Sequence, residues 1–242
     1  VSGTNKTILG MQYSIDQNLT RINAAPTSLK QKVYFNLQKS IIELEYKPGE
    51  LLKKQELCKE FGISRTPLSE AIALLMQDGL VEVVPQAGTY VAKLSMDDLH
   101  EGAFIREALE IAAIKLLAGI ITEPQLVKLR RNLRLQRVFI DDEDFQGFYA
   151  LDAQFHAMLL DFTGFDKLNR VADSAWINVN RVRRLLMPIA GRVEETYQEH
   201  VEIYGTLERG EPTKASNALE KHLRKLMTYI SPLEKSHPEY FT

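Results

Sequence analysis

One stretch, Glu56 to Val91, constrains the fold of this chain more than any other. Leu57 and Phe61 lie one turn apart and give a first helix an apolar stripe. Gly62 ends that helix, because glycine readily adopts the left-handed conformation found just past a helix C-terminus. A second helical pattern begins almost at once. The spacing predicts two helices joined by a tight turn that contains a glycine, which is a helix-turn-helix.

The second helix of this unit has a well-marked beginning. Ser64 stands at its N-cap position and Pro67 in its first turn, where these residue types are favoured. Its buried face is predicted to comprise Leu68, Ile72 and Leu75. In a helix-turn-helix, the start of the second helix enters the major groove of DNA. Here that start offers one cation and three hydroxyls, from Ser64, Arg65, Thr66 and Ser69.

Further elements flank these two helices. The pattern predicts a strand over 80–84, a turn over 85–88 and a return strand over 89–93. Upstream, apolar residues at helical spacing predict a helix over 28–45, which a Pro-Gly pair then ends. A helix-turn-helix followed by such a hairpin is a winged helix.

The same residues resemble the DNA-binding domain of the GntR superfamily of bacterial transcription regulators. The resemblance covers residues 28–94 and rests on GISRTPLSEAI at 62–72, DGLV at 78–81, AGTYV at 87–91 and PGELL at 48–52. It implies a winged-helix domain that contacts DNA. The implied contact residues are Lys54, Gln55, Ser64, Arg65, Thr66, Ser69, Gln86, Gly88 and Thr89.

The chain departs from the family pattern at two of these positions. The family commonly has Arg where this chain has Ser69, and often has Arg where it has Gln55, so two expected contacts are changed. The net charge of the domain is also small, with nine Lys or Arg against eight Asp or Glu in residues 28–94. A DNA-binding face must then come from local placement of cations. We expect it at Lys30, Lys32, Lys53, Lys54 and Arg65.

Composition limits the remaining choices. With 242 residues, of which 45% are hydrophobic, the chain can form two domains with real cores. The single cysteine, Cys58, excludes an internal disulfide and fits the reducing cytoplasm; we expect it to be a small core residue. Neither a membrane span nor a signal peptide is predicted. Residues 1–27 are polar and weakly patterned, and we expect a flexible arm there.

Beyond residue 94 the chain shows only helical patterns. Short connections between long amphipathic helices predict an antiparallel bundle over 95–232, followed by a C-terminal tail over 233–242. The expected fold class is therefore mainly α, an N-terminal winged helix-turn-helix plus a C-terminal six-helix bundle. The six helices are expected over 97–118, 123–139, 142–163, 166–186, 192–209 and 213–231.

Three histidines and one aspartate are placed on or beside apolar faces of these bundle helices. Asp152 and His156 are i, i+4 neighbours, while His200 and His222 each occupy the middle of an apolar stripe. A lone histidine in such a place is usually a hydrogen-bonded core residue. Four such groups together favour a metal, because a divalent cation relieves the cost of burying a carboxylate and binds imidazole well. We expect zinc, with nickel, manganese or iron as alternatives.

The bundle resembles the FCD ligand-binding domain of the FadR subfamily, and its six helices resemble the VanR-like group. The resemblance covers about 95–231 and rests on IREALEIAA at 105–113, the D-x-x-x-H and E-H motifs that contain the residues above, and A-x-x-x-H-L at 218–223. It implies a small carboxylate effector that coordinates a bound metal. The implied metal ligands are Asp152, His156, His200 and His222.

Arg106 corresponds to a family arginine that faces the effector pocket. From the residues alone, small neighbours on its helix face leave room for a ligand, and arginine can grip a carboxylate with two hydrogen bonds. The alternative is an ion pair with Glu110 one turn further on. Arg181, Arg183 and Arg184 form a charge run. We expect most of that run to be solvated, with one member able to reach the pocket.

These features predict a transcription repressor rather than an enzyme, acting as a homodimer on a palindromic operator and responding to a small carboxylate. An alternative of another class is a metal-dependent hydrolase or lyase acting on small carboxylic acids, since an open metal site can activate water. A third possibility is a metal sensor without an organic effector. The sequence does not identify the effector, the physiological metal, the operator or the direction of the response.

Overall fold

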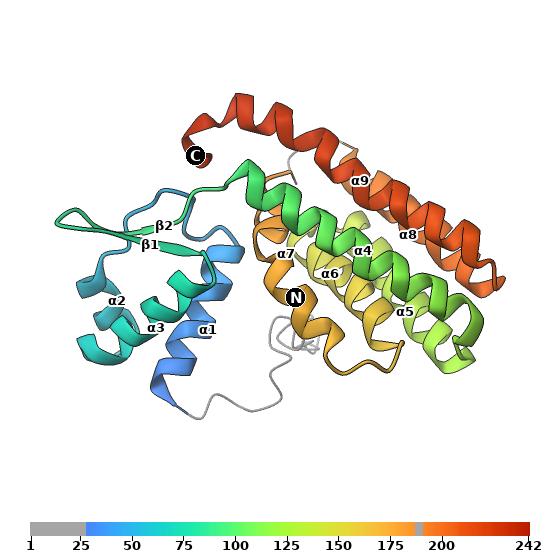
Figure 1. Ribbon diagram of the computed structural model, residues 1–242, viewed down its shortest axis with the longest axis horizontal. Helices are drawn as coiled ribbons and strands as arrows, with labels where there is room; N and C mark the ends of the chain where they lie inside the picture. The colour runs from blue at the N-terminus through green and yellow to red at the C-terminus, as the bar shows by residue number, and fades with distance from the viewer. Residues whose placement is uncertain (1–27, 187–190) are drawn as a thin grey trace, which may run out of the picture.

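The computed structural model describes residues 28–186 and 191–242. The expected arm over 1–27 lies outside these residues, as does Pro188, which the sequence places near a helix end. The described chain forms two units joined by a short linker, a winged helix-turn-helix and a bundle of helices (Figure 1). The mainly helical fold class predicted from the sequence is confirmed.

The winged unit consists of three helices and a hairpin. Its elements are α1 (Leu29–Ile42), α2 (Lys54–Glu60), α3 (Arg65–Gln77), β1 (Val81–Val84) and β2 (Gly88–Val91). The two strands pair antiparallel, with Val81 opposite Val91. The predicted apolar faces meet in one core, and burial of that core holds α3 in place at the surface. The core includes Val33, Leu37, Leu57, Leu68, Ile72 and Leu75.

Six helices of the described chain form the bundle, and α4 and α9 run side by side along its length (Figure 1). The main core lies among α4, α5, α6, α8 and α9. The elements are α4 (Met96–Ile120), α5 (Glu123–Asp141), α6 (Phe145–Asp161), α7 (Leu168–Leu185), α8 (Arg192–Glu208) and α9 (Pro212–Ser236), followed by a short 3₁₀ helix, η2 (Pro238–Tyr240).

Several helices begin or end a few residues from where the sequence predicts. The first helix stops at Ile42, three residues early. Helix α6 begins at Phe145, three residues late. At that point Asp144 accepts a hydrogen bond from the Gly147 backbone N–H (2.9 Å), which caps the helix and fixes its start.

The predicted end of the last helix at 231, and with it the predicted start of a tail at 233, was wrong. Helix α9 continues through Pro232 to Ser236. Proline is unfavourable inside a helix, but Leu233 packs into a buried apolar cluster with Leu94 of the linker. Burial of Leu233 extends the helix by a turn beyond the proline.

The C-terminal residues also hold the linker. Phe241 forms a parallel β-bridge with Leu94 and is buried in the same cluster. The Leu94 backbone N–H donates to the Tyr240 carbonyl (2.9 Å), and the Thr242 N–H donates to the Leu94 carbonyl (3.0 Å). The C-terminus therefore lies beside the junction of the two units (Figure 1).

Helix α7 contacts both units. Ile177 packs into the core of the winged unit. Arg181 is fully buried, and its Nη2 donates to the carbonyl of Ala92 (2.6 Å) just before the linker. Arg184 lies 3.5 Å from Glu43 at the end of α1. The expectation that this arginine run is mostly solvated was therefore wrong, because the run faces the winged unit and the bundle interior.

Candidate metal centre and nucleic-acid interface

The residues expected to contact DNA lie at the starts of α2 and α3 and at the tip of the wing. Seven of the nine are exposed, namely Lys54, Gln55, Ser64, Arg65, Thr66, Ser69 and Gln86. Ser64 occupies the N-cap position of α3, yet within the described chain its hydroxyl makes no capping hydrogen bond. The hydroxyl and the N–H groups of the first turn can therefore bind a phosphate.

The two remaining residues of the set, both at the wing, are less exposed. Thr89 is only 2% exposed, so it is withdrawn from the DNA-contacting set. Gly88 has a φ of 146°, and a Cβ placed there would lie 2.7 Å from Leu51 Cδ1. The positive φ favours glycine at this position, and the end of the Leu51 side chain would have to shift to admit a Cβ.

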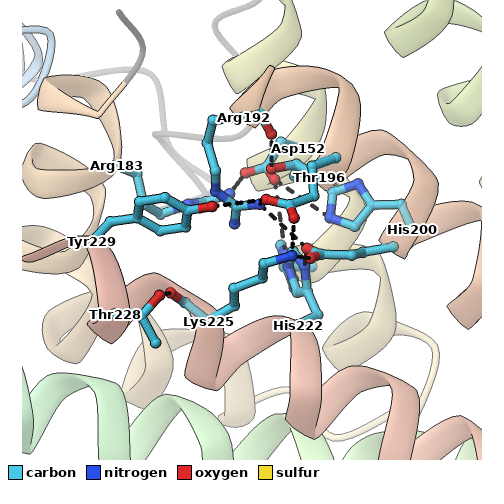
Figure 2. A network of polar contacts seen from close by, with 12 residues as sticks. Asp152, Arg183, Arg192, Thr196, His200, His222, Lys225, Thr228 and Tyr229 are labelled. Carbon is cyan, nitrogen blue, oxygen red and sulfur yellow. Dashed lines mark hydrogen bonds and ion pairs between the residues drawn. The ribbon is translucent and has the colours of Figure 1, made fainter. Parts of the chain in front are cut away.

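The four predicted metal ligands come together from three helices. Asp152 and His156 lie on α6, His200 on α8 and His222 on α9, and all four are buried. Figure 2 shows Asp152, His200 and His222 around one centre. Their potential ligand atoms lie within 4.8 Å of one another. The Nε2 atoms of His156 and His222 are 3.1 Å apart, and Asp152 Oδ1 is 3.4 Å from His200 Nε2.

Each imidazole is held by a hydrogen bond at its Nδ1. The pairs are His156 with Glu110 Oε2 (2.6 Å), His200 with Gln136 Oε1 (3.0 Å) and His222 with Glu199 Oε2 (2.7 Å). Carboxylate and amide oxygens accept, so each Nδ1 carries the hydrogen and each Nε2 presents a lone pair to the common centre.

This arrangement fits a cation. The Nε2 lone pairs of His156 and His222 face each other with no hydrogen between them. Asp152 Oδ1 and His200 Nε2 are buried and have no hydrogen-bond partner among the described residues. Leaving such atoms unpaired is costly, and a divalent metal bound by three imidazoles and a carboxylate removes that cost.

The protonation states also suit a metal. Burial lowers the pKa of His200 and of His222 well below the ordinary histidine value. Burial lowers the pKa of His156 as well, although the charge of Glu110 opposes the shift. A histidine whose pKa lies below neutral is uncharged at pH 7, which is the form that binds metals.

A cavity of about 20 Å³ borders Asp152 and His222, and Arg106 and Arg183 also line it. Both roles considered for Arg106 are compatible, since its Nε donates to Glu110 Oε1 (2.7 Å) while its buried Nη2 has no partner among the described residues. Arg183 is the member of the arginine run that reaches the site, where its guanidinium contacts Asp152 Oδ2 (Figure 2).

Gln136 and Glu199, which hold the Nδ1 atoms of His200 and His222, differ in how well the sequence indicates them. Gln136 follows Leu129 and Leu133 at helical spacing, so a polar residue interrupts an apolar stripe, the same signal that singled out His200. This pattern therefore indicates that Gln136 is a buried polar residue in need of a partner. The contact of Glu199 with His222 joins two helices, and no local spacing reports it.

An exposed recognition helix joined to a bundle with a buried polar site defines a transcription regulator with a DNA-reading unit and a ligand-binding unit. Residues 29–91 match the gntR family of bacterial regulatory proteins, and residues 101–225 match the FCD domain. The chain belongs to the GntR family and carries an FCD domain. It is a DNA-binding transcription regulator, which sets aside the hydrolase or lyase alternative.

Similar proteins support this assignment. The HTH-type transcriptional repressor RspR of Escherichia coli K12 is 29% identical over 92% of this chain and 97% of its own length. An uncharacterized HTH-type transcriptional regulator of Streptomyces ambofaciens is 30% identical over 88% of this chain and 89% of its own length.

Solved structures share the fold. A GntR transcriptional regulator from Rhodococcus sp. RHA1 superposes with a TM-score of 0.74 at 23% identity, over 85% of this chain and 99% of the other. Escherichia coli McbR/YncC also gives 0.74, at 19% identity, over 85% and 98% of the two chains. Within the described residues, no helix is both long and apolar enough to cross a membrane.

Proposed function

We propose that this regulator is a repressor whose FCD domain holds one divalent metal and senses a small carboxylate metabolite bound beside it. The observation that carries the proposal is the cluster of Asp152, His156, His200 and His222. Its four buried donor groups converge, and each histidine is fixed at Nδ1 by another side chain. Such fixed tautomers are the usual support of metal-binding histidines.

Zinc is the metal we expect, since three imidazoles and one carboxylate satisfy its preferred ligand types. Nickel, manganese and iron accept the same donors, so cellular supply also matters. A bound metal would supply positive charge and an open coordination position for a carboxylate oxygen. The protein contributes the four ligands, all of them buried.

The effector carboxylate is assigned to Arg106 as well as to the metal. Arg106 Nη2 is buried, borders the cavity and lacks a partner among the described residues. Its Nε is fixed by Glu110, and its guanidinium carbon lies 5.2 Å from the centre of the Trp176 ring. A guanidinium held in this way offers a preorganised donor to an anion.

On DNA, two copies of the chain would read a palindromic operator in the cytoplasm as a homodimer, because two-fold symmetric proteins match two-fold symmetric sites. Arg65 and Thr66 would reach base edges at the start of α3, while Gln86 would lie over the neighbouring groove from the wing. The role of repressor rests on likeness to RspR, which is named as one.

Metal content measured by elemental mass spectrometry tests the proposal. Untagged protein incubated with Zn²⁺ and desalted is expected to hold about one metal per chain. The His200→Ala/His222→Ala double variant is expected to hold much less. His100→Ala/His237→Ala is the matched control, since both of its histidines are exposed, and should keep the metal. A metal-free wild type would contradict the proposal, and so would equal content in the two double variants.

A further inference from the structure

Three arginines surround the cavity beside the metal ligands. Arg106, Arg183 and Arg192 all line it, and each is less than 10% exposed. They come from α4, α7 and α8, so three helices each direct a guanidinium toward one small volume. Figure 2 shows Arg183 and Arg192 on the same side of Asp152, away from His200.

Each of these cations has one inner carboxylate as its partner. The pairs are Arg106 with Glu110 (2.7 Å), Arg183 with Asp152, and Arg192 with Glu199 (3.5 Å). Arg192 also lies 3.2 Å from Glu195, and Lys225 pairs with both Glu195 and Glu199, the latter at 3.1 Å. With neutral imidazoles, the three arginines and Lys225 therefore meet four carboxylates, and the charges are balanced without a metal.

A divalent metal changes this balance by two positive charges. It also draws on Asp152, the same carboxylate that neutralises Arg183. A buried excess of positive charge is costly unless anions enter with it. A ligand with a single carboxylate would supply one negative charge and leave the other unmatched.

We infer that the effector is a dianion, with one carboxylate on the metal and Arg106 and a second acidic group on Arg183 and Arg192. This inference rests on the proposed function and narrows it to small diacids. The cavity of about 20 Å³ has room for about one water. A diacid is larger than this cavity, so its entry would require lining side chains to move, the Arg183 guanidinium on Asp152 among them.

Calorimetric titration of the zinc-loaded, full-length protein tests the inference with matched acids. Each pair has equal carbon number and differs by a terminal carboxylate: 2-hydroxybutyrate and malate, 2-hydroxyvalerate and 2-hydroxyglutarate, gluconate and glucarate. In at least one pair the diacid should bind about tenfold or more tightly than the monoacid, since a site built for a charged group rejects the analogue without it.

Substitutions of Arg183 test whether this residue causes the preference for diacids. Arg183→Gln should bring the diacid-to-monoacid affinity ratio close to one, with both acids titrated into the same zinc-loaded preparation of the variant. Arg183→Lys, which keeps the charge but not the forked donors, should give an intermediate ratio. The matched control is Arg184→Gln on the same helix, because Arg184 pairs with Glu43 and does not line the cavity. It should behave like the wild type.

The outcomes separate the two claims. Equal binding of monoacids and diacids would overturn the dianion and leave the metal-dependent carboxylate sensor intact. Diacid preference that survives in Arg183→Gln would overturn the assignment to Arg183. If the metal-loaded protein bound none of the six acids, the inference and the proposed effector class would both fail, while metal content would still be judged by mass spectrometry.

Discussion

The Glu110 carboxylate has two contacts that serve different parts of the site. Its Oε2 accepts from His156 Nδ1 (2.6 Å) and its Oε1 accepts from Arg106 Nε (2.7 Å). Burial opposes the charge of Glu110, but His156 and Arg106 outweigh burial and lower its pKa. Glu110 is therefore ionised in the folded protein, and it orients at once the proposed metal ligand His156 and Arg106, the proposed effector-binding cation.

Substituting Glu110→Gln keeps the shape but removes the charge. We expect zinc affinity to fall by about 10- to 100-fold, the usual effect of losing such a supporting group. Competition with a zinc-binding dye measures it. The control is Glu107→Gln, one turn earlier on α4, where the carboxylate pairs with Arg224 at the surface (2.7 Å). If both variants held zinc equally well, Glu110 would have no role in the metal site.

Arg65 is the exposed cation at the first position of the recognition helix α3. Removing a base contact of this kind costs about 1–3 kcal/mol, so Arg65→Ala should weaken binding to an operator selected from a random DNA pool by about 5- to 150-fold. Fluorescence anisotropy with labelled duplex measures it. Lys221→Ala removes an exposed cation from the bundle and should have little effect. Undiminished binding by Arg65→Ala would mean that α3 does not read the operator.

At the residue scale, the sequence predicted the polar residues that interrupt apolar helix faces. It did not predict which side chains form hydrogen bonds with the histidines among them. His200 and His222 were identifiable because a polar residue in the middle of an apolar stripe must find a partner. Glu110 stands 46 residues from His156, and their contact exists only once α4 and α6 pack. Thr89 was misassigned because a four-residue strand does not show which face is covered.

At the scale of elements, helices α4 and α7 pack closely together at Gly102, where the absence of a side chain leaves room for the backbone of α7. A Cβ at Gly102 would lie 2.6 Å from the carbonyl oxygen of Ala175, and backbone atoms cannot move aside easily. Gly119 lies near the other end of α4, and a Cβ there would meet no atom within 4 Å. The same helix therefore contains one glycine required by packing and one that only weakens the helix.

The same substitution at these two positions should change stability in opposite directions. Gly102→Ala forces α4 and α7 apart and should destabilise the protein by about 1–3 kcal/mol. Gly119→Ala should stabilise it by roughly 0.5 kcal/mol, because alanine restricts the unfolded chain and favours helix. Thermal unfolding followed by circular dichroism gives both signs. A fall in the midpoint for both variants would show that the second site is not open.

The helices and their order could be predicted from the periodic spacing of apolar residues and from the glycines and prolines between them, because these patterns are local in the sequence. Helix ends depend on contacts with other elements, and this is why α9 passes Pro232. The burial of Leu233 against Leu94 joins residues that are far apart in the chain. A sequence pattern gives the cost of a proline but not the packing that offsets it.

For the whole molecule, α7 connects the proposed metal site to the DNA-reading unit. Arg183 contacts Asp152 inside the bundle, while Arg181, two residues earlier, donates to Ala92 at the end of the wing. Ile177, one turn before Arg181, lies in the winged core. No local pattern indicates this arrangement, since Arg181 and Ala92 are 89 residues apart. Under the proposed function, a shift of Arg183 on ligand binding would act on the helix that holds the wing.

Arg181→Met tests whether this connection transmits the response. Methionine keeps much of the buried volume and removes the hydrogen bond to Ala92. In the wild type, zinc plus a bound diacid should change operator affinity by a factor within the usual range of about 5 to 150. In Arg181→Met that factor should fall several-fold toward one, while zinc content and diacid affinity stay near wild type. Fluorescence anisotropy of operator duplex, with and without ligands, measures the factor.

The control for this experiment is Arg209→Gln, which removes an exposed arginine that pairs with Glu211 far from the linker. It should keep the full ligand response. A ligand can shift the DNA-binding equilibrium only through contacts that differ between its two states. If Arg181→Met kept the complete response, the differing contacts would lie elsewhere, and the C-terminal residues that pair with Leu94 would be the next connection to break.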